Sequence, residues 1–328
     1  MEFNNIDAQP AILSEVADLA ENVRTGLIQT PKRLSSRFLY DAEGSRLFQE
    51  IMHVPEYYLT RSEYEILDKY KADLLLLFGR KIPFDLIELG AGDGLKTKVL
   101  LRHFLDQNIS FSYVPIDISV DVLNDLTAGL QRTFPDLSVE PQHDDYFNAL
   151  ERLAVDSDRR KVVLFLGSNI GNFTPTEAID FYRQLADRLR PGDLMLTGFD
   201  LQKDPAVIQA AYSDKQGVTR AFNLNLLRRI NRELDADFDL DAFDHYESYN
   251  PENGEARSYL VSHRKQTVQI RALAMTVDFQ NAEVIHTEIS RKFSKADIFG
   301  LADATGFSVA GWFADRKDYF ADVIFRKV

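Results

Sequence analysis

The sequence contains no cysteine among its 328 residues. This absence excludes disulfide bonds, thiolate nucleophiles, and zinc or iron–sulfur centres with cysteine ligands. Positive charge is also scarce, since 38 lysines and arginines stand against 51 aspartates and glutamates and leave a net charge of -13. Such a chain repels phosphate backbones and anionic membrane surfaces, so we expect neither nucleic acid nor a membrane among its partners.

Long apolar runs are lacking as well, and none approaches the ~18 residues of a membrane span. The first ten residues, MEFNNIDAQP, do not show the basic and then apolar order of a signal peptide. The six histidines are dispersed, and none forms a helical pair with metal-ligand spacing, so we expect no metal site. We interpret the chain as a cytoplasmic monomer that acts on a small molecule.

Short apolar runs alternate with helical patterns through the middle of the chain. This rhythm is typical of a parallel sheet with crossover helices. The apolar runs are 84–90, 111–119, 137–145, 161–167 and 193–200, and the helical patterns between them are 96–105, 121–134 and 176–190. The middle of the chain therefore predicts an α/β fold with a mostly parallel sheet.

The rhythm changes from about residue 203. A helical and then acidic stretch is followed by two β-like runs, 257–270 and 272–280, and the chain ends in a helical pattern and a β-hairpin. The length favours two domains, or one domain with a large insertion. We therefore predict that an inserted unit separates the last helix and the antiparallel C-terminal strands from the rest of the sheet.

A glycine-rich turn, LIELGAGDGLKT, covers residues 86–97. Glycines between a strand and a helix let backbone N–H groups approach a ligand. The dinucleotide pattern G-x-G-x-x-G is broken by Leu95, and a P-loop would need a glycine directly before Lys96. The turn therefore fits neither of these phosphate-binding motifs.

Three acids follow three successive predicted strands: Glu88, Asp117 and Asp145. The carboxyl ends of parallel strands share one edge of a sheet, where open α/β sheets bind ligands. One acid can bind both hydroxyls of a ribose, another an adenine amino group, while Gly90 and Gly92 leave room for an amino-acid tail. These are the parts of S-adenosylmethionine (SAM), whose positive sulfonium suits an acidic lining. A competing interpretation is that the acids cap helices, as Asp117 with Ser119 could.

Long segments of the chain resemble the histidine Nα-methyltransferases of ergothioneine biosynthesis, in a wider group that includes fungal enzymes acting on tryptophan-derived amines. The matching segments are 31–51, 54–67, the glycine turn, 165–175, 217–243 and 287–293. The resemblance implies a class I, Rossmann-like SAM-dependent methyltransferase domain at 62–202 and 293–328. It also implies a second α+β domain, at 1–61 and 203–292, that binds the substrate and closes over it.

The resemblance also implies the roles of individual residues. Asn172 and Tyr212 hold the substrate carboxylate, and Glu288 and Ser290 bind the imidazole. Tyr57 lies near the α-amino group and Tyr40 belongs to the same pocket, and these two tyrosines are the catalytic positions. The substrate-binding positions are Tyr57, Asn172, Tyr212, Glu288 and Ser290. The cofactor-binding positions are Glu88, Gly90, Gly92, Lys96, Asp117, Asp145 and Tyr146. The expected reaction is transfer of methyl groups from SAM to the α-amino group of L-histidine, three times, to give the betaine hercynine.

Each of these positions could instead serve only the packing or capping of the fold. The tyrosines could be packing aromatics, Asn172 could cap a helix, and Glu288 with Ser290 could line a solvated strand face. Two positions depart from the pattern of the family. Where its best-known members carry a methionine in the insertion, this chain has Ser258, and its glycine turn reads GAGDG and not the commoner form with a serine. Three alternatives therefore stand: methylation of another amino acid or aromatic amine, a non-catalytic protein that binds SAM or a betaine, and, third, a nicotinamide oxidoreductase.

Overall fold

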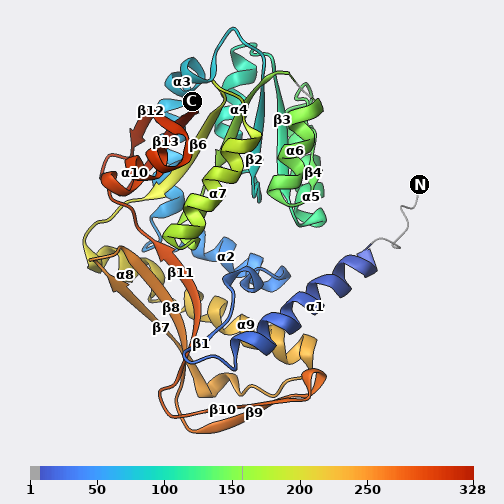
Figure 1. Cartoon of the computed structure of the whole chain (residues 1–328), viewed down its shortest axis with the longest axis vertical. Helices are drawn as coiled ribbons and strands as arrows, with labels where there is room; N and C mark the ends of the chain where they lie inside the picture. Colours follow the sequence, from blue (N-terminus) through green and yellow to red (C-terminus); the bar gives the residue numbers. More distant parts are fainter. Residues whose placement is uncertain (1–7, 157) are drawn as a thin grey trace. The chain divides into compact units, whose positions relative to one another are not determined.

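The computed structural model describes residues 8–156 and 158–328. Residues 1–7, which include most of MEFNNIDAQP and the start of the predicted substrate domain, lie outside this description. The chain forms two compact units (Figure 1). The larger unit comprises Leu59–Lys203 and Arg291–Val328, and the smaller unit comprises the residues up to Tyr58 together with Asp204–Ser290.

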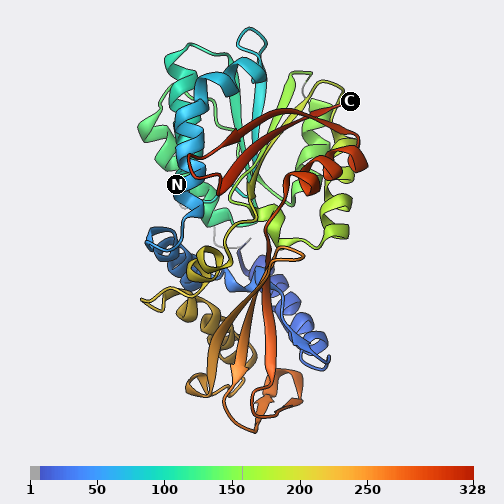
Figure 2. The same cartoon turned by 90° about the vertical axis from the view of Figure 1, so that its left-hand side faces the viewer.

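The larger unit contains, among its described residues, a seven-stranded sheet with the strand order β12-β13-β6-β5-β2-β3-β4. Its strands are β2 (Phe84–Leu89), β3 (Phe111–Asp117), β4 (Gln142–His143), β5 (Arg160–Phe165), β6 (Leu194–Asp200), β12 (Phe307–Ala314) and β13 (Phe320–Lys327). Strands β4, β3, β2, β5 and β6 run parallel, whereas β13 pairs antiparallel with both β6 and β12. The predicted parallel sheet with an antiparallel C-terminal hairpin is thus confirmed, and Figure 2 shows this hairpin in red.

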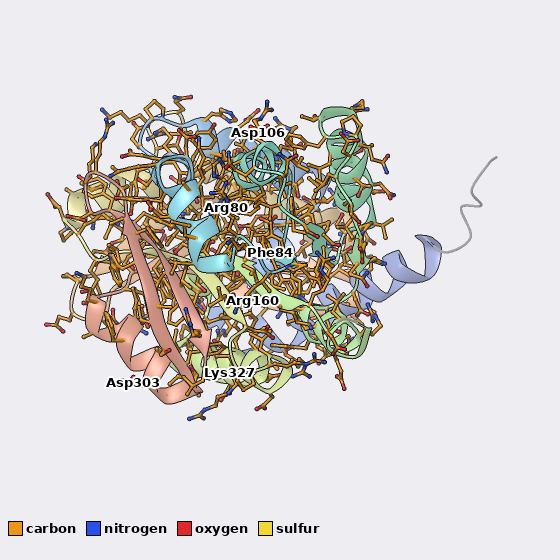
Figure 3. All side chains as sticks on the ribbon, turned by 90° about the horizontal axis from the view of Figure 1, so that it is seen from above. Arg80, Phe84, Asp106, Arg160, Asp303 and Lys327 are labelled. Atoms are coloured by element: carbon orange, nitrogen blue, oxygen red, sulfur yellow. The ribbon has the colours of Figure 1, made fainter. Side chains whose placement is uncertain are left out.

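Helices cover both faces of this sheet because its buried strands are apolar on both sides. The helices are α3 (Leu59–Phe78), α4 (Thr97–Asp106), α5 (Val120–Thr133), α6 (Tyr146–Asp156), α7 (Pro175–Arg188) and α10 (Lys295–Thr305). Along β2, Leu86 packs with α3, α4 and α5, while its neighbour Ile87 packs with α6, α7 and α10. At the amino end of the strands, Phe84 lies opposite Arg160, whose guanidinium donates to the Phe78 carbonyl at 3.1 Å (Figure 3).

Two of the predicted runs differ from the structure by more than a few residues at their ends. The run 137–145 supplies only β4, plus an isolated bridge at Val139. It lies at the sheet edge, and Pro141 interrupts it because proline cannot donate to a strand ladder. The run 257–270 is divided in two, because residues 263–265 turn the chain between β8 and β9.

The smaller unit contains, in its described part, a four-stranded sheet with the order β1-β11-β8-β7 and a two-stranded ribbon of β9 and β10. The strands are β1 (Lys32–Arg33), β7 (Phe243–Asn250), β8 (Glu255–Ser262), β9 (Gln266–Ile270), β10 (Met275–Phe279) and β11 (Val284–Arg291). Its helices are α1 (Ala8–Gly26), α2 (Ala42–His53), α8 (Pro205–Tyr212) and α9 (Val218–Leu234). Helix α9 contacts α2, β7 and β8, so it forms the centre of this unit.

None of the helices in the described residues is long and apolar enough to cross a membrane.

Candidate active site

The glycine turn follows β2 directly and depends on backbone conformations that favour glycine. Gly90, Gly92 and Gly94 have φ angles of 70°, 52° and 63°. A Cβ atom on Gly90 would lie 2.8 Å from Tyr146 Oη, and one on Gly94 would lie 2.7 Å from a Leu126 methyl carbon. A Cβ on Gly92 would meet no protein atom within 4 Å. The turn is therefore tightly packed at Gly90 and Gly94 and open at Gly92, where a ligand can approach the backbone.

Asp117 is the last residue of β3 and is joined to this turn. Its carboxylate accepts hydrogen bonds from the backbone N–H groups of Gly92 and Ser119, the latter at 3.0 Å. Burial raises the pKa of Asp117, and these N–H groups oppose the rise. Helix α5 is capped by the Ser119 hydroxyl, which accepts from Val122 N–H at 3.3 Å. Asp117 is therefore not the capping residue, and its carboxylate stays at the strand end beside the glycine turn.

Asp145 has a different environment from the one expected of an acid at a strand end. It follows the short strand β4 by two residues and precedes α6, where its carboxylate accepts from the N–H groups of Phe147 and Asn148 at 2.9 and 3.1 Å. Asp145 therefore caps α6. Contact of Asp145 with an adenine amino group remains a prediction.

Tyr146, the first residue of α6, places its hydroxyl against the glycine turn. The contact at Gly90 described above is with this hydroxyl, so a side chain at Gly90 would displace it. Burial, followed by the charge of Asp117, raises the pKa of Tyr146 to about 12. Tyr146 is therefore a neutral hydroxyl at physiological pH, near both Gly90 and Asp117.

Glu88 is buried and hydrogen-bonded within the protein. One carboxylate oxygen accepts from Thr97 Oγ1 at 2.6 Å and the other from Tyr113 Oη at 2.5 Å. Burial raises the pKa of Glu88 to about 7. Because its two oxygens accept from Thr97 at the start of α4 and from Tyr113 in β3, Glu88 links these two elements by hydrogen bonds. A direct contact of Glu88 with a bound donor remains a prediction.

Lys96 directly precedes α4 and forms an ion pair with Glu63 of α3. Glu63 is fully buried and also accepts two hydrogen bonds from Gly167 N–H. The sequence does not mark Glu63 as a site residue, because an acid in a helix is usually solvated. The only available signal is its spacing, three and four residues before the core residues Ile66 and Leu67.

These residues fit the methyl donor SAM by their chemistry. Gly92 provides open space at the backbone, Asp117 provides an acceptor suited to a ribose diol, and Lys96 provides a cation suited to the carboxylate of the donor's amino-acid tail. Within residues 8–156 and 158–328, no group of three or more histidines and acids is arranged to hold a metal ion.

In the smaller unit, aromatic side chains gather around the predicted substrate positions. The rings of Tyr57 and Tyr212 lie 6.4 Å apart in an edge-to-face arrangement, and both side chains are buried. Tyr40 makes similar contacts with Phe48 and Phe222, at 5.5 and 5.4 Å. The structure thus brings together three tyrosines, from the residue before Asp41 and α2, the α2–α3 connection and α8.

Polar groups of β11 complete this cluster. Tyr212 Oη lies 2.7 Å from Ser290 Oγ. Although 39% of Tyr40 is exposed, protein atoms crowd its hydroxyl, and this burial followed by the charge of Glu288 raises its pKa well above the usual value. Glu288 is therefore close to Tyr40, and the same strand brings Ser290 to Tyr212. We call Tyr40, Tyr57, Tyr212, Glu288 and Ser290 the tyrosine cluster.

Ser258 has a buried acidic partner. It lies opposite Glu247 across β7 and β8, and its hydroxyl donates to Glu247 Oε2 at 2.8 Å. The Ser258 carbonyl accepts from Thr287 Oγ1 at 3.1 Å, and Thr287 precedes Glu288 in β11. Ser258 therefore belongs to a polar network on the strand next to Glu288.

Asn172 lies in the larger unit, as the last residue of the 3₁₀ helix η2 (Asn169–Asn172) that follows β5. It does not cap α7, because Thr174 does so through a capping box with Glu177. The turn before η2 includes Gly167 and Ser168, both with positive φ. Contact of Asn172 with the substrate carboxylate remains a prediction.

Comparison with known proteins gives similarity over nearly the whole chain. A family model described as "Histidine-specific methyltransferase, SAM-dependent" matches residues 19–327. Histidine N-alpha-methyltransferase of Mycolicibacterium smegmatis is 38% identical over 302 residues, which cover 92% of each chain. The protein of that name from Mycobacterium tuberculosis is 37% identical with the same coverage. Ergothioneine biosynthesis protein 1 of Schizosaccharomyces pombe is 29% identical over 331 residues, 98% of this chain and 42% of that protein.

Proposed function

Since the chain belongs to the family of SAM-dependent, histidine-specific methyltransferases, we propose that it methylates the α-amino nitrogen of free L-histidine up to the trimethylated betaine, hercynine. The larger unit holds the donor through the glycine turn, Lys96, Asp117 and Tyr146. The smaller unit holds the amino acid through the tyrosine cluster. The family supports the reaction class, and the composition of the two sets of side chains supports this division.

The observation that carries the proposal is the chemistry of the tyrosine cluster. It combines neutral hydroxyls with one carboxylate, Glu288, and the raised pKa of Tyr40 keeps that hydroxyl protonated. An amine must be neutral to attack a methyl sulfonium, and neutral hydroxyls orient its N–H groups without adding a positive charge beside the nitrogen. The Glu288 carboxylate accepts hydrogen bonds, and an imidazole N–H can donate one to it.

The reaction then needs positioning more than acid–base power. Bound SAM supplies a methyl group already activated by its positive sulfur. Tyr57 and Tyr40 orient the amine so that its lone pair faces the methyl carbon. In such a transfer the new C–N bond would form as the C–S bond breaks, and the electron pair of that bond would return to sulfur. The ammonium proton of the incoming amino acid, and later that of each methylated intermediate, would pass to water before the next transfer.

Three finer points belong to the same proposal. The enzyme works as a monomer, it is cytoplasmic, and it does not act on nucleic acid. The net charge of -13 supports the last point, because it opposes binding to phosphate backbones. Light scattering, cell fractionation and a nucleic-acid binding assay test these points one by one.

Calorimetry combined with turnover tests the proposal against a binding protein without activity. We expect the chain to bind SAM and histidine and to transfer labelled methyl groups when both are present. Binding of both ligands without transfer would contradict the proposed enzyme. Transfer to another amino acid but not to histidine would redirect the proposal to a different substrate.

A further inference from the structure

Glu63 is a buried charge that the proposed reaction does not use directly. It lies in the second turn of α3, with no exposed surface, on the side of the helix that carries Ile66 and Leu67. Its oxygens accept from Gly167 N–H at 2.8 and 2.9 Å and form the ion pair with Lys96. One carboxylate thus connects α3, the turn after β5 and the start of α4.

The sheet leaves a specific space for this carboxylate. A Cβ atom on Gly198 of β6 would lie 2.1 Å from Glu63 Oε1, which is well inside van der Waals contact. The same atom would lie 3.0 Å from the ring of Phe320, so it could not be accommodated by a shift to that side. Only a residue without a Cβ atom at position 198 therefore leaves room for the Glu63 carboxylate.

A second buried acid, Asp322, lies near the pair of Glu63 and Lys96. Asp322 lies opposite Gly198 on β13, it is fully buried, and neither of its carboxylate oxygens has a hydrogen-bond partner within the described chain. Burial and the charge of Glu63 raise the pKa of Asp322 well above its usual value. Asp322 therefore favours its neutral form, and Glu63 is the acid that directly contacts Lys96.

The pair lies beside the donor positions. Lys96 Nζ is 3.4 Å from the place of a Cβ on Gly167, and the amide nitrogen of Asn169 is 3.9 Å from the place of a Cβ on Gly90. Lysine is a flexible cation whose pKa falls readily on burial, so it needs a fixed counter-charge to stay protonated and in place. The donor carries one anionic group, the carboxylate of its amino-acid tail, and Lys96 supplies a cation suited to it.

We propose that Glu63, admitted by Gly198, is a positioning residue that holds Lys96 and the Gly167 backbone so that the lysine binds the carboxylate of the methyl donor. This inference rests on the proposed function, because it assumes that the larger unit binds SAM. It assigns Glu63 a role in donor affinity and none in the choice of amino acid. A purely structural Glu63 would affect stability and both substrates together.

The variant Glu63→Gln separates these roles. Glutamine keeps the size of the side chain and an acceptor for Gly167 N–H, but it removes the charge that fixes Lys96. We expect the Kd for SAM, measured by calorimetry, and the KM for SAM to rise at least tenfold, while the KM for histidine stays within twofold. Asp73→Asn, on the exposed side of the same helix, is the matched control and should leave all three values unchanged. A wild-type Kd for SAM in Glu63→Gln would overturn the proposal.

Two further measurements show whether Glu63 acts through Lys96. In a Lys96→Met background, Glu63→Gln should change the Kd for SAM less than twofold. With decarboxylated SAM as the ligand, Glu63→Gln should likewise bind as the wild type does. Independent, additive losses in the double variant, or an equal loss with the decarboxylated donor, would overturn the proposal.

Folding is checked by the melting temperature of each variant. If Glu63→Gln does not fold, Glu63→Asp provides the test, because it keeps the charge on a side chain too short to reach both Gly167 and Lys96. Its Kd for SAM should rise at least threefold, and a wild-type value would contradict the inference. Failure of the wild-type protein to bind SAM would instead refute the proposed function, so the two failures are distinguishable.

Discussion

The hydroxyl oxygen of Tyr212 lies 2.7 Å from Ser290 Oγ, and this contact joins the end of α8 to β11. Either hydroxyl can be the donor in this contact. The contact holds two hydroxyls side by side, at two of the positions proposed to bind the substrate. We expect this pair to bind the substrate and not to take part in bond making.

Tyr212→Phe removes one of these hydroxyls while it preserves the ring packing against Tyr57. We expect the KM for histidine to rise up to about tenfold with little change in kcat, since one hydrogen bond contributes roughly 0.5–1.5 kcal/mol. Steady-state kinetics measures both constants. Tyr246→Phe changes an exposed tyrosine of the same unit and is the control. Equal losses in kcat would show that the hydroxyl acts in the chemical step instead.

Glu288→Ala tests the choice of substrate. A hydrogen bond to a charged group contributes roughly 1.5–3 kcal/mol, so we expect kcat/KM for histidine to fall by about one to two orders of magnitude. Competition between histidine and an aromatic amino acid, followed by product analysis, measures the change in preference. Glu252→Ala, in an exposed turn, is the matched control. Unchanged activity on histidine would favour the alternative substrates, a possibility raised by Ser258.

Asp117→Ala tests the donor site in the larger unit. Loss of the carboxylate removes the acceptor proposed for the two ribose hydroxyls, and we expect the Kd for SAM to rise by roughly 10–100-fold. Calorimetry with SAM and with its demethylated product measures this change, which should be similar for both because they share the ribose. Asp125→Ala, on the exposed face of α5, should bind like the wild type. Equal affinity in Asp117→Ala and the control would remove Asp117 from the site.

Glu88 makes stability depend on pH. Its pKa is raised from 4.5 to about 7 by burial, so between these values the folded protein holds a proton that the unfolded chain has released. Proton binding by the folded state stabilises it at low pH, and this contribution is lost as pH rises through about 7. The full difference is on the order of 3 kcal/mol.

Glu88→Gln removes this titration while it keeps partners for Thr97 and Tyr113. We expect the wild type to lose stability relative to Glu88→Gln as pH increases from 5 to 8, by urea unfolding at each pH. The hydroxyls of Thr97 and Tyr113 and the charge of Lys96 lower the pKa of Glu88, whereas the charge of Glu63 raises it further. Parallel pH curves for the two proteins would show that Glu88 is ionised throughout this range.

Much of the larger unit was predictable from the sequence, because buried parallel strands and amphipathic helices leave clear periodic patterns. The glycine turn and Asp117 could be found for the same reason, since each directly follows an apolar run. The short strand β4 was predicted too long because Pro141 and polar neighbours limit an edge strand. Asp145, expected at a strand end, caps α6 instead, a difference of two residues that only the backbone reveals.

Other parts of the site could not be predicted. Glu63 resembles a surface acid in the sequence, and its contacts with Gly167 and Lys96 join segments far apart in the chain. Similarly, Ser258 and Glu247 become neighbours only through the register of β7 and β8. Long-range polar contacts of this kind depend on tertiary structure and leave no local periodicity.

The most direct test of the central claim is the structure of the product itself. Wild-type protein is incubated with SAM bearing a labelled methyl group and with histidine, and the products are examined by mass spectrometry and NMR. We predict histidine with one, two and finally three methyl groups, all on the α-amino nitrogen. Methyl groups on the imidazole ring, or no methylated histidine at all, would contradict the account.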